Sequence, residues 1–530
     1  MPLTLGTDAD RFKVHFRGLL GDHFAAQEVR VPVASGSGGE GGEGAEAART
    51  APGTPAWELL LPAAAAPARS RGRSLQSALR DAVRSGRLAP GTRLPSSRAL
   101  AADLGVSRGL VTEAYEQLTA EGYLRSDRGA GTWVGGAARA AERGARDLAP
   151  RPVHARVDFI AGTPDLSLFP RSAWAAAHRG VLADLAHDQL GYPDPRGLPR
   201  LRTALAELLT RRRGVVADPE GIVVCSGVAQ AMALIGFVLH ARGVRTVGVE
   251  DPGSPQHDEL FASAGVSTVP VPLDDEGVLT GVLRERGVRA VVTTPAHQFP
   301  LGIGYSARRR AELLDWARAV DGLVVEDDYD GDFRYDRTPV GALQGLDPGH
   351  VAYTGSVSKS LAPGLRLGWL LVPDAMTEEV VARKRMMDLG NPVLDQALFA
   401  RLVERGDYDR QLRRCQRAYR ERRDALVAAL AEHFPGSEVS GIAAGLHVIA
   451  RLPGRWGPQD VFLRRAAAAG VAVRPLSDYA HAGEDAARGP GLALVLGYAH
   501  LSPARLAEGV RLLAEAVQEL DHARVQSTRR

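Results

Sequence analysis

Lysine is scarce in this chain of 530 residues, because only Lys13, Lys359 and Lys384 occur among its 65 basic residues. Arginine supplies surface charge, phosphate contacts and salt bridges, but its guanidinium keeps its proton at any working pH. A lysine amine can lose its proton and attack a carbonyl group to form a Schiff base. Lys359 follows the hydroxyl-rich run at residues 354–358 and is predicted to be a reactive amine. Lys13 and Lys384 lack such surroundings, which predicts surface positions.

Cysteines and long apolar runs are also scarce. Cys225 and Cys415 are the only cysteines, too few for a disulfide framework, which predicts a reducing cytoplasmic location. No stretch approaches about 18 uninterrupted apolar residues, and the first 20 residues lack the layout of a signal peptide, so neither a membrane span nor a leader is predicted. The net charge of +3 is too small to predict nucleic-acid binding by the whole chain. Residues 69–135 differ, with 11 arginines against 6 acidic residues (11 − 6 = +5), which predicts a local basic surface.

Composition and hydrophobic patterning divide the chain into five parts. Residues 1–56 are a low-complexity N-terminal extension, residues 57–135 a small helix-rich domain, and residues 136–156 an Ala/Arg/Gly-rich linker. Residues 157–520 alternate short β-branched runs with amphipathic helices, which predicts an α/β domain with a mostly parallel sheet. Residues 521–530 are a tail. Three of the β-branched runs are 221–224, 288–293 and 322–325.

Three helices and a hairpin are predicted in the small domain. Apolar residues at helical spacing predict a helix over 74–83, capped by its first residue, a second helix over 98–104, and a third capped by Ser107. The second and third helices are joined by a tight turn at Gly105, which makes a helix-turn-helix. Residues 123–134 have the pattern of strand, turn and strand, which predicts a wing.

The third helix of such a unit enters the major groove of DNA with its N-terminal end first. Its first turn offers Ser107, Arg108 and Thr112, beside backbone amides that suit a phosphate. Arg98 heads the second helix and Arg128 lies in the wing, where both are candidates for phosphate or minor-groove contacts. The alternative is a helical protein-interaction domain with a solvated basic face.

Four short runs of residues in this segment favour DNA binding over protein interaction. They are residues 94–101 (LPSSRALA), 104–108 (LGVSR), 114–118 (AYEQL) and 121–124 (EGYL). Together they resemble the winged helix of GntR-type bacterial transcription regulators over about 65 residues. The resemblance implies that the small domain binds operator double-stranded DNA.

Lys359 needs further groups if it holds a cofactor. A pyridoxal ring requires a phosphate cradle, an acid for its ring nitrogen and a donor for its phenolic oxygen. Ser226 begins a Ser-Gly turn between a predicted strand and a predicted helix, where backbone amides suit a phosphate. Ser356, Ser358 and Arg366 add hydroxyls and a charged fork.

An acidic run at residues 326–330 follows a predicted buried strand. Alternate side chains of an extended segment share a face, so Asp327 and Tyr329 are predicted to point together. There Asp327 keeps a pyridine nitrogen protonated and Tyr329 meets the ring oxygen. The alternative for such an acidic run is a solvated loop or a metal site; no metal is predicted here.

Five motifs occur along the large domain in an order that is typical of one family of enzymes. They are residues 191–197 (GYPDPRG), 226–227 (SG), 294–302 (TPAHQFPLG), 326–329 (EDDY) and 356–359 (SVSK), the last followed by Arg366. In this order, residues 157–520 resemble the fold-type I aminotransferases nearly end to end. The His-Gln pair before Phe-Pro-x-Gly and the fused winged helix make the chain similar to the MocR subfamily, regulators built on an aminotransferase body.

This resemblance implies a pyridoxal 5'-phosphate transferase fold with a small C-terminal α+β subdomain. Lys359 then carries the cofactor as a Schiff base, Asp327 pairs with the ring nitrogen, and Tyr329 meets the ring oxygen. Asp328 is the alternative to Asp327, because a one-residue shift in alignment exchanges them. Tyr192 comes from the neighbouring subunit of a homodimer. The phosphate is held by Val228, Ala229, Ser356, Ser358 and Arg366.

Two positions depart from the family pattern. The aromatic residue that stacks on the cofactor ring in a Pro-Gly-Tyr turn is Ser254 here, which cannot stack. Transaminases hold the substrate carboxylate with an arginine near the C-terminus, and Val495 stands in that place. Losing a bidentate clamp costs several kcal/mol of ligand binding, on the order of two charged hydrogen bonds. Arg474 is a possible substitute.

These features favour a DNA-binding regulator whose aminotransferase-like domain binds pyridoxal phosphate and senses an amino compound or the vitamer itself. At most, we expect transaldimination at Lys359, in which a ligand amine displaces the lysine. Such a ligand shifts the dimer only if it binds two states with different affinity. The alternatives are a working aminotransferase with an accessory DNA-binding domain and a scaffold that dimerises without cofactor.

Overall fold

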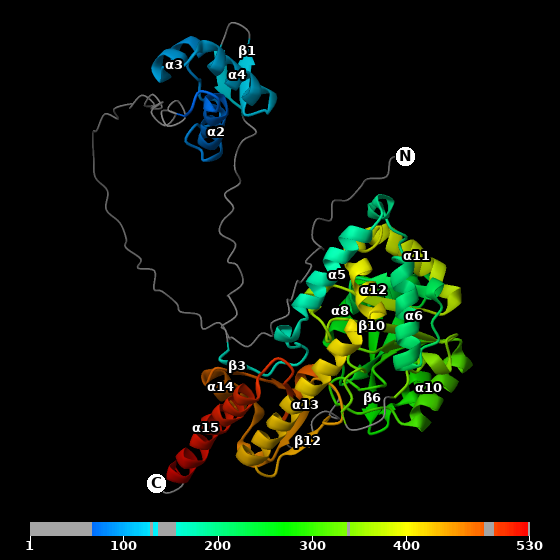
Figure 1. Cartoon of the computed structure of the whole chain (residues 1–530). Helices are drawn as coiled ribbons and strands as arrows, with labels where there is room; N and C mark the ends of the chain where they lie inside the picture. The colour runs from blue at the N-terminus through cyan, green and yellow to red at the C-terminus, as the bar shows by residue number, and fades with distance from the viewer. Residues whose placement is uncertain (1–65, 128–130, 136–154, 336–339, 482–491, 528–530) are drawn as a thin grey trace, which may run out of the picture. The chain divides into compact units, whose positions relative to one another are not determined.

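The structure is a computed structural model, and it describes residues 66–127, 131–135, 155–335, 340–481 and 492–527 (Figure 1). The chain divides into two compact units, Met1–Arg151 and Pro152–Arg530. The predicted N-terminal extension, most of the predicted linker and Arg128 lie outside the described residues.

The small unit contains the three predicted helices. They are α2 (Arg71–Arg84), α3 (Ser97–Leu104) and α4 (Arg108–Ala120). The predicted start of the first helix was wrong, because α2 begins at Arg71 after Ser70 and Ser74 lies inside it. This extra turn is polar, and the apolar stripe from which the helix was predicted begins only at Leu75.

The other helix ends agree with the capping pattern. The Ser96 hydroxyl accepts a hydrogen bond from the Ala99 amide, and the Ser107 hydroxyl accepts one from the Leu110 amide. Gly105 ends α3 with a φ of 64°, a left-handed conformation that glycine adopts without steric cost. The turn between α3 and α4 is therefore fixed from both sides.

The wing is an antiparallel hairpin of β1 (Leu124–Asp127) and β2 (Gly131–Val134). Its inward residues, Leu124 and Val134, pair directly and join the helices in one apolar core. The hairpin is thereby held against the helix-turn-helix by the same core.

The large unit is built on an eight-stranded sheet with the order β4-β11-β10-β9-β8-β5-β6-β7. The five strands from β10 to β6 are parallel, while β11 and β7 run antiparallel to their neighbours. The mostly parallel α/β sheet that the sequence predicted is confirmed. Its strands are β4 (Ile222–Cys225), β5 (Thr246–Asp251), β6 (Ser267–Asp274), β7 (Gly277–Val278), β8 (Ala290–Thr293), β9 (Leu323–Asp327), β10 (Val351–Ser356) and β11 (Gly368–Leu371).

Helices cover both faces of this sheet. Alternate residues of β4 belong to different apolar clusters: Val223 and Cys225 pack with α7 and α11, whereas Ile222 and Val224 pack with α6, α12 and α13. Such two-sided burial explains why the strands read as continuous apolar runs. The helices of this part are α5 (Arg171–Asp184), α6 (Pro199–Arg213), α7 (Val228–Ala241), α8 (Pro255–Ser263), α9 (Thr280–Glu285), α10 (Ala307–Val320), α11 (Asp374–Asp388), α12 (Val393–Glu404) and α13 (Asp407–His433).

A smaller α+β part follows at the C-terminal end of the large unit, as the sequence predicted. Figure 1 shows the long helix α13 running from the neighbourhood of α12 to this part. Its four-stranded sheet has the order β12-β13-β16-β15. The elements are β12 (Glu438–Ser440), β13 (His447–Leu452), α14 (Gln459–Ala468), β15 (Arg474–Pro475), β16 (Leu492–Gly497) and α15 (Pro503–Ser527). None of the described helices combines the length and apolar character that crossing a bilayer requires.

Candidate functional site

The carboxyl ends of three strands bring the predicted motifs to one edge of the large sheet. Ser226 follows β4, the acidic run begins at the end of β9, and Lys359 follows β10 by three residues. Ligands of open α/β sheets bind at this edge. The chain folds so that segments far apart in the sequence face a shared site.

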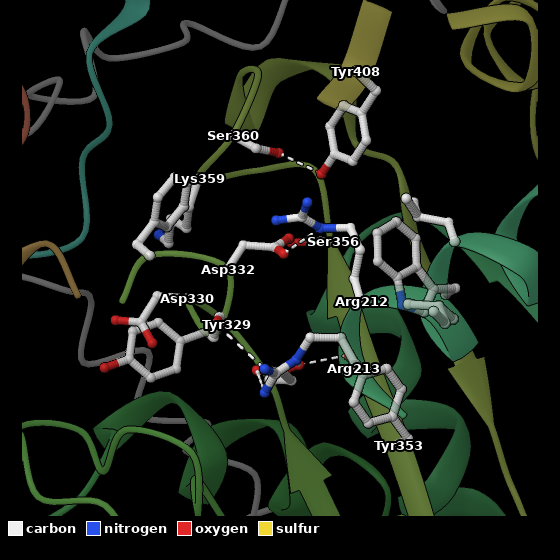
Figure 2. Close-up of a pocket in the computed structure, with 16 residues that line it drawn as sticks. Arg212, Arg213, Tyr329, Asp330, Asp332, Tyr353, Ser356, Lys359, Ser360 and Tyr408 are labelled. Carbon is white, nitrogen blue, oxygen red and sulfur yellow. Dashed lines mark hydrogen bonds and ion pairs between the residues drawn. The ribbon is translucent and has the colours of Figure 1, made fainter. Parts of the chain in front are cut away.

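Lys359 lies partly buried at this edge, and its Nζ donates a hydrogen bond of 2.6 Å to the Gly162 carbonyl. Burial lowers the pKa of its amine, while the charges of Asp330 and Asp327 act in the opposite direction. Figure 2 shows Lys359 on the same side of the view as Tyr329 and Asp330. A lowered pKa increases the neutral fraction of the amine, which is the form that attacks a carbonyl.

Asp327 lies at the end of β9 beside a histidine that sequence reasoning missed. Its Oδ2 is 3.6 Å from the Nε2 of His257, and its Oδ1 accepts a hydrogen bond of 3.4 Å from Thr354. His257 lies on α8 and is only 7% exposed. The sequence signal was its position three residues after Ser254, in the first turn of the helix that follows strand β5.

Asp328 points to a different set of partners. It forms a buried ion pair with Arg213, with 2.6 Å between Nε and Oδ2, and it accepts a hydrogen bond from the Tyr353 hydroxyl. Figure 2 shows Arg213 and Tyr353 on the opposite side of the view from Lys359. Asp328 is thus held in a structural ion pair, while the neighbouring Asp327 has no arginine or lysine partner within the described residues.

Tyr329 belongs to a buried polar cluster. The Nδ1 of His297 is 3.0 Å from the Tyr329 hydroxyl and 2.8 Å from the Oδ2 of Asp330. Burial, then the negative charge of Asp330, raises the pKa of the Tyr329 phenol well above its usual range, and Asp327 adds to this. The phenol therefore stays protonated and can donate a hydrogen bond. In the sequence, His297 stands out only as part of a family motif, and Asp330 ends the acidic run without a predicted role.

The loop between β4 and α7 has the form of an anion cradle. Val228 and Ala229 open α7, so their backbone amides point out of the N-terminus of a helix. Gly227 has a φ of 82°, a conformation that favours glycine, and a Cβ there would lie 2.7 Å from the Arg366 guanidinium and displace it. Arg366 also donates a hydrogen bond to the Ser226 carbonyl. At the end of β10, the Ser356 hydroxyl accepts a long hydrogen bond of 3.4 Å from the Ser358 amide.

Lys384 is buried beneath this loop, and its predicted surface position was wrong. It is 0% exposed, and its Nζ donates hydrogen bonds of 2.7 Å to Asp388 and to Asn391. Asn391 in turn donates to the hydroxyl of Ser226, and Gln230 bonds both the Ser226 amide and Asp388. Its helix, α11, showed no sequence motif, although Asp388 lies one turn later on the same helix and Asn391 lies three residues beyond its end. This network of hydrogen bonds holds the loop between β4 and α7 in place.

The two departures from the family pattern lie in ordinary structural settings. Ser254 precedes α8 as its N-cap. Val495 lies in the middle of β16, is 0% exposed and belongs to an apolar cluster with Ile449 and Tyr479. Tyr192 is 89% exposed and so does not fold back into the site of its own chain.

Three of the predicted DNA-contacting side chains of the small unit are exposed to solvent. Arg98 and Arg108 are exposed at the starts of α3 and α4, and neither forms an ion pair with a described residue. Ser107 is also exposed, although its hydroxyl caps α4. Thr112 is half-buried, and its hydroxyl donates back to the Arg108 carbonyl. The four residues thus gather around the first turns of α3 and α4.

Two family models match the two units. The model for the bacterial regulatory proteins of the gntR family matches residues 72–134, and the model for aminotransferases of class I and II matches residues 157–483. Solved aminotransferases also match the fold. The multiple substrate aminotransferase of Thermococcus profundus superposes with a TM-score of 0.61 at 29% identity, over 69% of this chain and 92% of that chain.

Two transcriptional regulators match most of the chain. A probable rhizopine catabolism regulatory protein, MocR of Rhizobium meliloti, is 33% identical over 473 residues, which cover 85% of this chain and 94% of that protein. The pyridoxine biosynthesis transcriptional regulator PdxR of Corynebacterium glutamicum is 33% identical over 413 residues, which cover 76% of this chain and 88% of that protein. The chain thus carries both family domains and matches these regulators over most of its length. The chain belongs to the MocR-type regulators of the GntR superfamily, DNA-binding proteins with an aminotransferase-like body that binds pyridoxal phosphate.

Proposed function

We propose that this regulator senses a small amine, an amino acid or the vitamer itself at Lys359 and passes the change to an operator-bound homodimer. The observation that carries the proposal is the placement of the partly buried Lys359 amine at the same sheet edge as Asp327 and Tyr329, where burial lowers its pKa and so increases its neutral fraction. Pyridoxal phosphate supplies an aldehyde that reacts reversibly with amines. Such a regulator of operator DNA works in the cytoplasm.

The described residues fit this cofactor in four respects. Lys359 offers the amine, Asp327 offers a carboxylate for the ring nitrogen, and Tyr329 offers a phenol that stays protonated. The opening of α7 offers backbone amides for the phosphate, and the Nε2 of His257 on α8 lies 3.6 Å from Asp327. The remaining phosphate-binding groups that we propose are Ser356, Ser358 and Arg366. In favour of Asp327 rather than Asp328 as the partner of the ring nitrogen is the engagement of Asp328 by Arg213.

We propose exchange of amines without turnover. A transaminase must hold its substrate carboxylate while a proton moves, and the position for that arginine is Val495, which is buried in an apolar cluster. Binding and release of an amine at Lys359 require no such clamp. A second candidate function is a working aminotransferase, which the intact set of Lys359, Asp327 and Tyr329 favours.

We propose that the working unit is a homodimer in which Tyr192 reaches the cofactor site of the neighbouring subunit. Support comes from the 89% exposure of Tyr192 and from other exposed apolar side chains around it. The Leu389–Asn391 segment packs against Pro193, because a Cβ on Gly390 would lie 2.7 Å from the Pro193 ring. The exposed apolar residues of these segments are Leu190, Met386, Met387 and Leu389. A second copy of the chain would cover them.

The proposal is tested by titrating amines, amino acids and free pyridoxal phosphate into the purified full chain, with absorbance spectra and operator mobility shifts read in parallel. We expect one compound to change both readouts at the same concentration. A Lys359→Ala variant should bind operator and lose both responses. Keto-acid product from an amino-acid donor would instead establish the aminotransferase, and a colourless protein that ignores every compound would refute sensing at Lys359.

A further inference from the structure

An arginine lies next to the position where transaminases carry the carboxylate-binding arginine. Val495 occupies the arginine position on β16, and the residue paired directly opposite it on the antiparallel strand β15 is Arg474. Residues directly opposite each other in an antiparallel pair project to the same face of the sheet, with their Cβ atoms about 4.5–5.5 Å apart. A guanidinium is therefore present on the face where Val495 stands, displaced by one strand.

This face of the small sheet is the one that packs against the cofactor site. Val495 shares its apolar cluster with Phe299 and Tyr479. The ring of Phe299 contacts Tyr329 edge-on, with 5.9 Å between centroids, and contacts Tyr479 in the same way at 5.3 Å. Phe299, which packs against the cluster of Val495, thus also contacts the ring of Tyr329, the phenol proposed to meet the cofactor ring.

The sheet face that carries Val495 also lies close to Lys359. Gly497, at the end of β16, is so close to Ala161 that a Cβ on Gly497 would lie 2.8 Å from the Cα of Ala161. Ala161 precedes Gly162, whose carbonyl accepts the hydrogen bond from the Lys359 amine. The reactive amine and the Val495 face are therefore separated by one short segment of backbone.

Arg474 is available for a ligand. It is half-buried, and within the described residues it forms no ion pair with a carboxylate. Its guanidinium lies next to the Tyr479 hydroxyl: burial raises the pKa of that phenol, and Arg474 partly opposes the rise. A partly buried guanidinium that pairs with no carboxylate in the described part of the chain suits an incoming anion, because the arginine fork matches the two oxygens of a carboxylate.

We propose that Arg474 binds the carboxylate of an effector whose amine is directed to Lys359, so that the effector is an amino acid rather than a simple amine. This inference rests on the proposed sensing function and adds the class of ligand. In this chain the carboxylate-binding arginine is on β15, whereas in transaminases it occupies the β16 position. This difference changes the distance between amine and carboxylate that the site accepts. Arg474 therefore selects the spacer length of the effector.

The experiment compares amino acids with their decarboxylated counterparts on the full-length, cofactor-loaded protein. Glycine, β-alanine and 4-aminobutyrate are titrated against methylamine, ethylamine and propylamine, and the change in cofactor absorbance gives each apparent Kd. For at least one pair we expect wild-type protein to bind the amino acid on the order of 10- to 100-fold more tightly, the worth of a charged, paired hydrogen bond. Arg474→Gln should reduce this ratio to about 1, the value expected when the added carboxylate gains no charged hydrogen bond.

A control variant, Arg451→Gln, and a conservative variant, Arg474→Lys, test whether the loss of preference comes from the Arg474 guanidinium itself. Arg451 on β13 is opposite Ala493, on the same face of the same sheet, but it is exposed and lies two residues farther from Gly497 along β16. Arg451→Gln should keep the wild-type ratio, and Arg474→Lys should keep part of it. All variants should keep the affinity for simple amines and the absorbance of the bound cofactor.

The outcomes separate the two proposals. If Arg474→Gln keeps the wild-type ratio, or if wild-type protein binds each amino acid no better than its amine counterpart, the clamp is refuted while sensing at Lys359 stands. If no amine of either kind changes the absorbance, both proposals fail. Loss of the preference in Arg474→Gln alone supports the clamp.

Discussion

Asp328→Asn and Asp327→Asn are the same chemical change at adjacent positions, and the structure predicts opposite consequences. Asp328 and Arg213 are 3% and 4% exposed and share two contacts, at 2.6 and 3.1 Å, while the Tyr353 hydroxyl donates a third hydrogen bond to the same carboxylate. Removing one partner of a buried ion pair leaves an uncompensated charge, at a cost of about 3–5 kcal/mol. Because asparagine keeps one accepting oxygen, we expect Asp328→Asn to lower the free energy of unfolding by about 3 kcal/mol.

Asp327→Asn should have the reverse effect. This carboxylate has no arginine partner among the described residues, and its contact with His257 is 3.6 Å, so its removal should cost below about 1 kcal/mol. A neutral amide cannot hold a pyridine nitrogen protonated, however, so the absorbance of the bound cofactor should shift and its affinity should fall. Asp328→Asn should leave that absorbance unchanged.

Urea unfolding of the full chain, followed by tryptophan fluorescence, measures the first effect, and absorbance spectra with added pyridoxal phosphate measure the second. Asp315→Asn is the control, since Asp315 is 69% exposed in a surface pair with Arg318 and should cost no more than about 0.5 kcal/mol. Equal losses of stability in the Asp327 and Asp328 variants, or a spectral shift confined to Asp328→Asn, would refute the assignment of their roles.

Four further results are expected. Lys359→Ala should abolish the visible absorbance of the bound cofactor and the mass adduct that borohydride traps at this residue. Arg108→Ala should weaken operator binding by about 5- to 100-fold in a mobility shift and reduce its salt dependence, with the cofactor absorbance intact. Burial lowers the pKa of His447 from 6.5 to about 4. Its contribution to stability is therefore complete above pH 6.5 and is lost as the pH falls toward 4. In unfolding measurements across this pH range, His447→Gln should remove up to about 3 kcal/mol of the pH dependence. Tyr192→Ala should bind the cofactor weakly, and mixing it with the Lys359→Ala variant should restore tight binding at one site of each mixed dimer; no recovery in an equilibrium-dialysis measurement would contradict the shared site.

The sequence predicted the features that are local. Helical spacing and serine caps located α3 and α4 closely, and continuous β-branched runs located β4, β8 and β9. The start of α2 was missed because its first turn carries no apolar residue. Within the site, hydroxyls, acids and the lysine were found because each stands in a short recognisable run.

The missed features depend on tertiary contacts. Lys384 was predicted to lie on the surface because its burial and its contact with Gln230 arise only when α11 packs against α7, although Asp388 lies one turn later on its own helix. His257 and Asp330 could not be given roles, since their roles follow from which strands lie side by side. The opposition of Arg474 and Val495 is likewise a matter of strand register, which one sequence without a hairpin connection does not specify.

The near absence of lysine has a practical consequence for chemistry on the folded protein. Of the two lysines in the described part of the chain, Lys384 is sealed inside a network of hydrogen bonds and Lys359 stands at the cofactor site. Acylating reagents therefore meet no competing described lysine on the surface of the aminotransferase-like body. Mass spectrometry after brief acylation would follow the opening and closing of the Lys359 site as a footprint, in the unmodified natural sequence and without an engineered probe.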